Sequence, residues 1–293
     1  MNMTVILRAV ELGLIFAILS MGEFITVRVM DTPDLTVDGS FVTGACTAAM
    51  LTVAGHPYLA LPAAFAAGML CGCVTAFLQT KLHIQTLLAG ILTMTGLYSI
   101  NLRIMNGMPN VSLYQAGKPL KTLLSDPSTQ LATLCVIVLV IALILYWFFK
   151  TNLGLTLRAV GDNPEMVSSS SINVDGMKFL GFSLSNGLVA LSGALYAQFM
   201  NSADVTSGSG MLVLGLAGII IGEAIIRKSS IGCGLAASII GAILYRLLYS
   251  FALQLGFAAS DMNLVSAVLV AITISIPYIQ KKYLKRKGGK AHA

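Results

Sequence analysis

The chain has 293 residues, of which 56% are hydrophobic and only 10% are charged. A soluble domain carries about 25% charged residues, so this composition excludes an ordinary soluble fold and indicates a polytopic membrane protein. The net charge of +6 does not indicate nucleic-acid binding, because the cations fall in short loops and near the C-terminus without interleaved aromatic residues.

Apolar runs near the roughly 20 residues that cross a bilayer recur along the chain. The first run is read as a span and not as a signal peptide, because Glu11 interrupts it and no small-residue cleavage site follows. We predict an all-α fold, a polytopic membrane helical bundle forming one domain over residues 1–293. Nine membrane segments are expected at 5–27, 37–55, 57–80, 84–105, 129–149, 177–200, 209–226, 230–253 and 262–280.

The distribution of Lys and Arg predicts the orientation. If the polar stretch 151–178 lies in the cytoplasm, most cations fall on that side, including six in a basic tail at 281–293. The outer side then holds few Lys and Arg residues, two of which lie in the long loop 106–130. By the positive-inside rule, the N-terminus is expected outside and the C-terminus inside.

Several polar side chains fall within the expected spans. Thr93, Thr95, Tyr98 and Asn101 are spaced so that two or three can share one helix face, and Asn186 lies among small residues of the sixth segment. They can form a polar stripe along a translocation path or hydrogen bonds between helices, which membrane bundles commonly use.

Ionisable residues inside spans are candidates for function because they are costly there. Glu223 precedes Arg227 by four residues and can pair with it along one helix face. Glu23 and Glu223 are expected at the inner interface, with a structural role or a role in gating the inner mouth. Glu11 and Arg246 fall in the outer halves of their spans and are expected to pair or to face a wet cavity.

The stretch 151–178 is far longer than a connection between two membrane helices requires, and it carries signals for a helix of its own. Asp162 or Asn163 can act as the N-cap, Pro164 suits the first helical position, and Glu165 complements the helix dipole. Gly161 is expected to let the chain turn just before this helix. The pattern predicts a short exposed helix between two spans, although an ordinary amphipathic loop is an alternative.

The residues LGLTLRAVGDNPEMV at 153–167, followed by INVDGMK at 172–178, resemble the cytoplasmic coupling segment of bacterial ABC-importer permeases. These permeases carry branched-chain amino acids, ribose and related solutes. Ser171 stands where that family usually has glycine. The resemblance implies that the segment docks on a separate ATPase, through Arg158, Ala159, Gly161, Asp162, Asn163, Pro164, Glu165 and Met166.

Two further stretches are similar to the same family. Residues 34–40 read DLTVDGS and resemble a DLSVG signature, with Asp38 inserted, although a polar turn is the plain interpretation. In the family this region leads into a broken helix beside the path, which makes Asp34 and Ser40 candidates for it. Residues 82–107 resemble the family's span of the form P.FI.TLG, with departures at Gln85 and Ala89.

The sequence offers little for chemistry in this chain itself. It contains no G-x-x-x-x-G-K-[ST] loop, HExxH motif or Ser/His/Asp set, and its five cysteines form no CxxC pair. We therefore expect no enzyme activity, no catalytic or metal-binding residues and no cofactor bound by this chain. Any ATP-Mg would be bound by a partner.

The resemblance implies a permease subunit of an ABC importer in the bacterial cytoplasmic (inner) membrane. Its expected partners are a second copy in a homodimer, two ATPase subunits, an external solute-binding lipoprotein or periplasmic protein, and membrane lipid. The expected cargo is a small solute, an amino acid and possibly an aromatic one. The alternatives are an ion-coupled secondary transporter or channel that uses Glu23 or Glu223, and a membrane scaffold that moves nothing.

Overall fold

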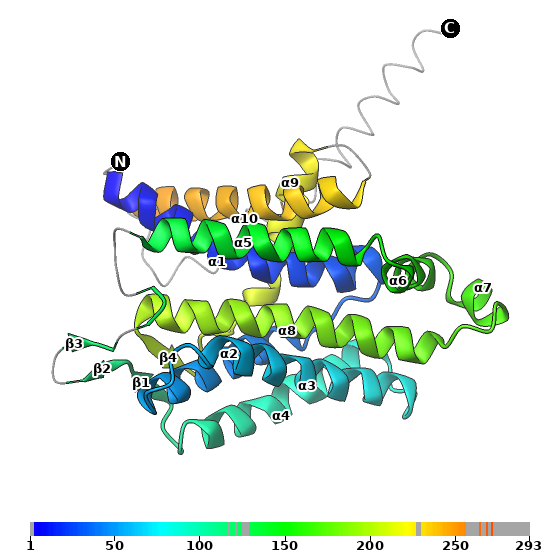
Figure 1. The fold of residues 1–293 in the computed structure, drawn as a ribbon, viewed down its shortest axis with the longest axis horizontal. Coiled ribbons are helices and arrows are strands. Elements are labelled where there is room, and N and C mark those ends of the chain that lie inside the picture. Colours follow the sequence, from blue (N-terminus) through cyan, green and yellow to red (C-terminus); the bar gives the residue numbers. More distant parts are fainter. Residues whose placement is uncertain are drawn as a thin grey trace, which may run out of the picture.

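A computed structural model describes residues 3–115, 118–120, 122–124, 129–226 and 230–255, together with the single positions 264, 268 and 271. The described chain is a bundle of helices (Figure 1). The helices are α1 (Met3–Phe24), η1 (Ile25–Val29), α2 (Val37–Val53), α3 (Ala60–Thr80), α4 (Thr86–Ile104), α5 (Gln130–Phe148), α6 (Asn152–Asp162), α7 (Pro164–Ser169), α8 (Val174–Met200), α9 (Met211–Ile225) and α10 (Ile231–Gln254).

Four short strands complete the described elements: β1 (Asn110–Ser112), β2 (Tyr114–Gln115), β3 (Lys118–Pro119) and β4 (Ser202–Asp204). β1 pairs antiparallel with β4, and β2 pairs antiparallel with β3. Hydrogen bonds from the Thr206 side chain and backbone, with a further one from Asn110, hold the pKa of Asp204 below its usual range. These pairs lie at the end of the bundle opposite to α6 and α7 (Figure 1).

Within the described residues, six helices are long and apolar enough to cross a membrane, namely α1 with η1, α3, α4, α5, α8 and α10. The apolar helices α2 and α9 are shorter. Eight of the nine expected segments thus correspond to helices with similar bounds. The ninth, at 262–280, and the tail at 281–293 lie almost entirely outside the described residues.

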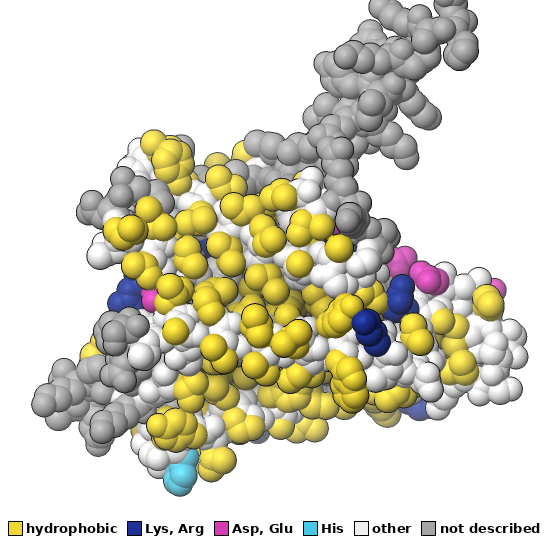
Figure 2. All heavy atoms as spheres, turned by 45° about the horizontal axis from the view of Figure 1, so that its top comes forward, with side chains coloured by type: hydrophobic (Ala, Val, Ile, Leu, Met, Phe, Trp, Pro, Cys, Tyr) yellow, Lys and Arg dark blue, Asp and Glu magenta, His cyan; other side chains and the backbone are white. Residues whose placement is uncertain are grey.

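The lateral surface of the bundle is apolar. On α5, Val136, Leu139, Leu143 and Trp147 each expose more than half of their area. Figure 2 shows hydrophobic side chains over the middle of the visible face, with charged side chains gathered toward its two ends. This distribution suits a protein whose sides contact lipid and whose ends contact water.

Helix α8 lies at the centre of the bundle and is mostly buried, with α1 against one side and α2 and α3 against the other (Figure 1). Glycines allow the close approach. A Cβ atom on Gly44 of α2 would overlap the backbone of Ala190, and one on Gly72 of α3 would overlap the backbone of Phe182. The small residues of these spans therefore serve close helix packing.

Two helices begin inside the bundle instead of at its ends. After η1 the chain turns back through residues 31–36, and α2 starts beside Asn186, near the midpoint of α8. Helix α9 starts beside the first turn of α2, where Asp38 accepts hydrogen bonds from the backbone of Gly210 and Leu212. The expected segments 37–55 and 209–226 are thus discontinuous elements whose N-termini meet within the bundle.

The stretch expected to hold one short helix holds two, α6 and α7, and Asn163 ends the first and caps the second. The Asn163 side chain accepts from the backbone of Met166 at 3.0 Å, and Pro164 occupies the first turn of α7, as predicted. The expected role of Gly161 is wrong. It lies within α6, where a Cβ atom would overlap the carbonyl oxygen of Val29, so its small size serves packing against η1.

The end of α7 shows why a glycine suits position 171. Helix α7 ends at Ser169, and Ser171 has φ of +61°. That left-handed conformation is one that glycine adopts without steric cost, whereas serine is strained there.

Candidate translocation path and coupling surface

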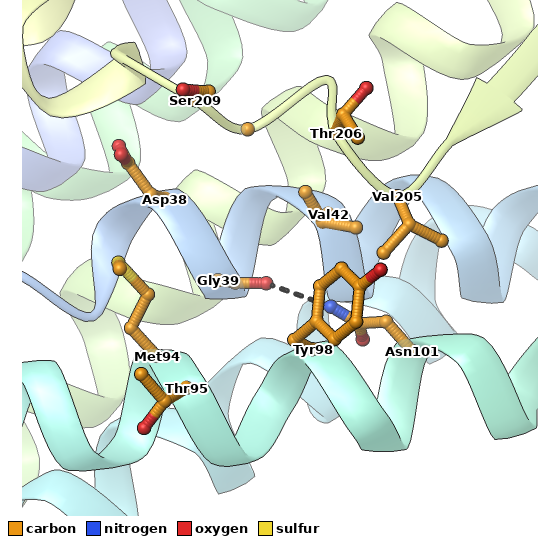
Figure 3. A pocket seen from close by; sticks show the side chains of 11 residues that line it. Asp38, Gly39, Val42, Met94, Thr95, Tyr98, Asn101, Val205, Thr206 and Ser209 are labelled. Carbon is orange, nitrogen blue, oxygen red and sulfur yellow. Dashed lines mark hydrogen bonds between the residues drawn. The ribbon is translucent and has the colours of Figure 1, made fainter. Parts of the chain in front are cut away.

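A cavity of about 530 Å³ lies between α2, α4 and the loop that precedes α9 (Figure 3). Asp38, Gly39 and Val42 line it from α2, and Val205, Thr206, Gly208 and Ser209 line it from the loop. Helix α4 contributes Met94, Thr95, Tyr98 and Asn101. Because the loop follows β4, this cavity lies toward the end of the bundle opposite to α6 and α7.

The polar stripe predicted on α4 divides between two roles. Thr95, Tyr98 and Asn101 line the cavity, and Tyr98 exposes 54% of its area. Asn101 is buried and donates from Nδ2 to the Gly39 carbonyl at 3.3 Å, while its Oδ1 has no partner among the described residues. Thr93 does not line this cavity; it is buried, and its hydroxyl donates to the Ala89 carbonyl within its own helix.

The other three path candidates are buried and lie outside the lining of this cavity. Asn186 donates from Nδ2 to Oδ2 of Asp34 at 2.7 Å and accepts at Oδ1 from the Ser40 hydroxyl at 2.6 Å. Asp34 also accepts from the backbone N–H of Thr36. This network fixes the start of α2 against the middle of α8, so it positions the cavity wall.

Asp38 lines the cavity and was not among the residues that the sequence singled out as candidates. It sits in the first turn of α2, and its two carboxylate oxygens accept from the backbone N–H groups of Gly210 at 3.2 Å and Leu212 at 2.8 Å. One side chain thereby joins the starts of two discontinuous helices. The sequence signal that could have identified Asp38 is its insertion relative to the DLSVG signature that residues 34–40 resemble.

Glu23 does not reach an interface, contrary to the expectation. It is fully buried in α1, and neither carboxylate oxygen has a hydrogen-bond partner among the described residues. The side chain is packed against Gly215 of α9, where a Cβ atom would collide with it. The expectation was wrong because α1 is a core helix, covered by α9 at this depth.

Glu223 pairs with Arg28, which η1 supplies. The expected partner, Arg227, lies outside the described residues. The Arg28–Glu223 pair borders a pocket at the α6 end, which Arg158 and Asp162 also line. The pair therefore joins the end of α9 to the helix against which α6 packs.

Glu11 and Arg246 lie near different groups. Glu11 is buried, 3.9 Å from Arg8 in the preceding turn. Arg246 lies 4.5 Å from the ring centroid of Tyr249 and 5.5 Å from that of Phe16, and it lines a second cavity of about 340 Å³. Glu11 and Arg246 therefore do not pair with each other. Arg246 lines a cavity, which was the other expectation, and Glu11 lies beside Arg8.

The segment formed by α6 and α7 presents most of the coupling candidates on its surface. Leu157, Val160 and Val167 are buried and anchor it to the bundle. Gly161 is half-buried against η1, and the remaining candidates are exposed: Arg158, Ala159, Asp162, Asn163, Pro164, Glu165 and Met166. An exposed ridge with an apolar anchor is a surface on which a second protein can act.

Comparison with known proteins agrees with this architecture. Residues 5–276 match the family model described as the permease component of branched-chain amino acid transport systems. This chain belongs to that permease family of ABC importers. No solved structure matches it.

Individual relatives cover nearly all of this permease. A tyrosine transport system permease protein of Clostridioides difficile (strain R20291) is 39% identical over 269 residues, covering 92% of this chain and 90% of the relative. An uncharacterized protein of Rickettsia prowazekii (strain Madrid E) is 35% identical, with 93% and 98% covered. The ribose import permease of Escherichia coli (strain K12) is 26% identical, with 83% and 76% covered.

The permease is thus a multi-pass protein of the bacterial cytoplasmic membrane and a transport subunit, like its relatives.

Proposed function

We propose that this permease moves an amino acid, specifically an aromatic one, from an external binding protein into the cytoplasm. Two copies of the chain form the path, and two separate ATPases that bind ATP-Mg drive it by acting on α6 and α7. The family membership supports the ATPase and binding-protein partners. The C. difficile relative, named for tyrosine transport, supports the aromatic cargo.

The observation that carries this proposal is the position of α9. Its start is held by Asp38 at the cavity, and its end carries Glu223, which pairs with Arg28 of η1. Helix α6 packs on η1 through Gly161. A displacement of the surface helix can therefore reach the cavity through contiguous packed elements, which alternating access requires.

Reconstitution tests the proposal. Proteoliposomes that contain the permease, its ATPase and its binding protein are expected to accumulate labelled L-tyrosine only when ATP-Mg is supplied on the ATPase side. Liposomes that lack the ATPase, or that carry a Walker-lysine variant of it, are the controls. Accumulation of L-tyrosine without ATP or without the ATPase would contradict the proposal.

One observation favours the second candidate, an ion-coupled transporter. Glu23 is buried with no partner for either oxygen among the described residues, and an uncompensated carboxyl at membrane depth is typical of proton-coupled sites. In that case a proton or sodium gradient would drive uptake without any ATPase, and Glu23→Gln would abolish it. In the ABC importer, Glu23→Gln keeps the packing against Gly215 and is expected to retain ATP-driven uptake.

A further inference from the structure

Arg246 lies within α10, a helix long and apolar enough to cross the membrane. A cation at such a position is costly unless it pairs with an anion or faces a polar cavity. Among the described residues the ion pairs join Arg8 with Glu11, Arg28 with Glu223, and Lys81 with Asp175. Arg246 is in none of them, so no carboxylate of that part of the chain compensates its charge.

Aromatic rings flank this arginine. Its guanidinium carbon lies 4.5 Å from the Tyr249 centroid and 5.5 Å from the Phe16 centroid. Rings attract a cation through their faces, and the Tyr249 side chain also hydrogen-bonds the guanidinium, but a guanidinium carries five N–H donors. Nε of Arg246 is buried and has no hydrogen-bond partner among the described residues. The Nε–H group of Arg246 can therefore still donate a hydrogen bond to a ligand.

The cavity next to Arg246 has a volume of about 340 Å³. Phe16 and Tyr196, whose rings stack with centroids 5.9 Å apart, form one wall, and the first residues of α9 form another. This size is at the lower end of small-molecule sites, which run from about 300 to 1,000 Å³. It can hold one aromatic ring with a short polar group.

The neighbouring helix start does not supply the positive charge. Asp38 already accepts from the backbone N–H groups of Gly210 and Leu212, on the side of the first cavity. Ser209 lines both cavities, whereas Asp38 lines only the first of the two. The charge that a ligand in the second cavity meets is that of Arg246.

We propose that Arg246 binds the carboxylate of an aromatic solute in this cavity, with the ring of the solute against Phe16 and Tyr196. The planar guanidinium offers paired N–H donors that match a carboxylate, which a lysine cannot reproduce. The inference rests on the proposed function, because it assumes that the cargo is an aromatic amino acid. It names the group on this chain that recognises one end of that cargo.

Binding to the full-length permease in phosphatidylcholine nanodiscs tests the inference without ATP or partners. Three probes share the phenol ring: L-tyrosine, 3-(4-hydroxyphenyl)propionate, which lacks the ammonium group, and tyramine, which lacks the carboxylate. The wild type is expected to bind the two carboxylates at least about tenfold more tightly than tyramine, the ratio that a charged hydrogen bond supplies. Arg246→Gln is expected to lose this preference, and Arg103→Gln, at an exposed arginine, to keep it.

If the glutamine variant does not fold, Arg246→Lys, which keeps a cation, replaces it. Its preference for the carboxylate probes over tyramine is expected to fall about tenfold or more, because an ammonium cannot form the bidentate contact. Equal binding of all three probes by the wild type, no binding of any probe, or an unchanged preference in Arg246→Lys would overturn the inference. Protection from unfolding by phosphatidylglycerol that depends on Arg246, without protection by the carboxylate probes, would identify a lipid-phosphate site and also overturn it. ATP-driven uptake is measured separately, so the importer function can hold even where the Arg246 site fails.

Discussion

Asn186 is the residue on which the start of α2 depends. Its amide oxygen and nitrogen are matched to opposite partners, because Ser40 donates to Oδ1 and Asp34 accepts from Nδ2. All three side chains are buried, with exposures of 0%, 0% and 1% for Asn186, Ser40 and Asp34. A buried polar group without a partner is costly, so the network is stable only when complete.

Asn186→Ala removes the hydrogen bonds to both Ser40 and Asp34 at once. Since each buried group left unpaired costs about 1–3 kcal/mol, the apparent melting temperature of the purified permease should fall markedly. Thermal unfolding in detergent, followed by static light scattering, measures the change. Asn110→Ala is the control, because Asn110 is exposed and its side chain donates to Asp204 at the surface. Equal melting temperatures for the wild type and Asn186→Ala would contradict this role.

At the scale of elements, the contact between α6 and η1 depends on one glycine. A Cβ atom at position 161 would overlap the Val29 carbonyl oxygen, which belongs to the backbone and cannot rotate away. The surface helix must therefore shift outward when any side chain is added. The motif that resembles the coupling segment contains this glycine for packing, whereas its sequence position had indicated a turn.

Gly161→Ala should lower ATP-driven uptake at least about tenfold while leaving the amount of folded permease nearly unchanged, since overpacking at one contact costs about 1–3 kcal/mol. Uptake and ATP hydrolysis are measured in the same proteoliposomes, and hydrolysis is expected to continue. Gly96→Ala is the matched control, because that helical glycine faces open space. Wild-type uptake in Gly161→Ala would show that this packing does not carry the coupling.

At the scale of the whole molecule, α9 links the first cavity to the α6 end of the bundle. Its start is bonded to Asp38 of α2 beside that cavity, and Glu223 in its last turn pairs with Arg28, which lies in the helix that supports α6. The pair is partly exposed, with 47% and 33% of the two side chains accessible, so its value to stability is small. We expect instead that this ion pair makes α9 move together with the coupling segment formed by α6 and α7.

A charge swap tests whether the Arg28–Glu223 pair couples α9 to α6 and α7 or serves only stability. Glu223→Arg should reduce ATP-driven uptake by placing two cations together, and Arg28→Glu with Glu223→Arg should restore most of it by re-forming the pair in reverse. Uptake normalised to folded protein is the measurement. The exposed pair Lys81–Asp175 is swapped in the same way as a control. A double variant as weak as Glu223→Arg alone would mean that the charges act separately.

Features that local interactions control could be predicted from the order of the residues. Hydropathy over about 20 residues determines which stretches can cross a membrane, and the expected bounds of the first eight segments fall close to those of α1 to α5 and α8 to α10. Capping is equally local, so the sequence predicted Asp162 or Asn163 as the N-cap and Pro164 in the first turn, and the structure has Asn163 as the cap. The spacing on α4 similarly predicted that two or three of its four polar residues would share a face, and Thr95, Tyr98 and Asn101 do line one cavity.

The depth at which each helix begins, and the choice of charges that meet, depend on packing between distant parts of the chain. Asp38 and Leu212 are 174 residues apart, and Arg28 and Glu223 are 195 apart, so no local pattern connects them. The burial of Glu23 beneath Gly215 and the position of Arg246 between Phe16 and Tyr249 likewise depend on how α1, α9 and α10 pack. Periodicity reports which face of a helix is apolar, but contacts between distant helices determine what lies opposite that face.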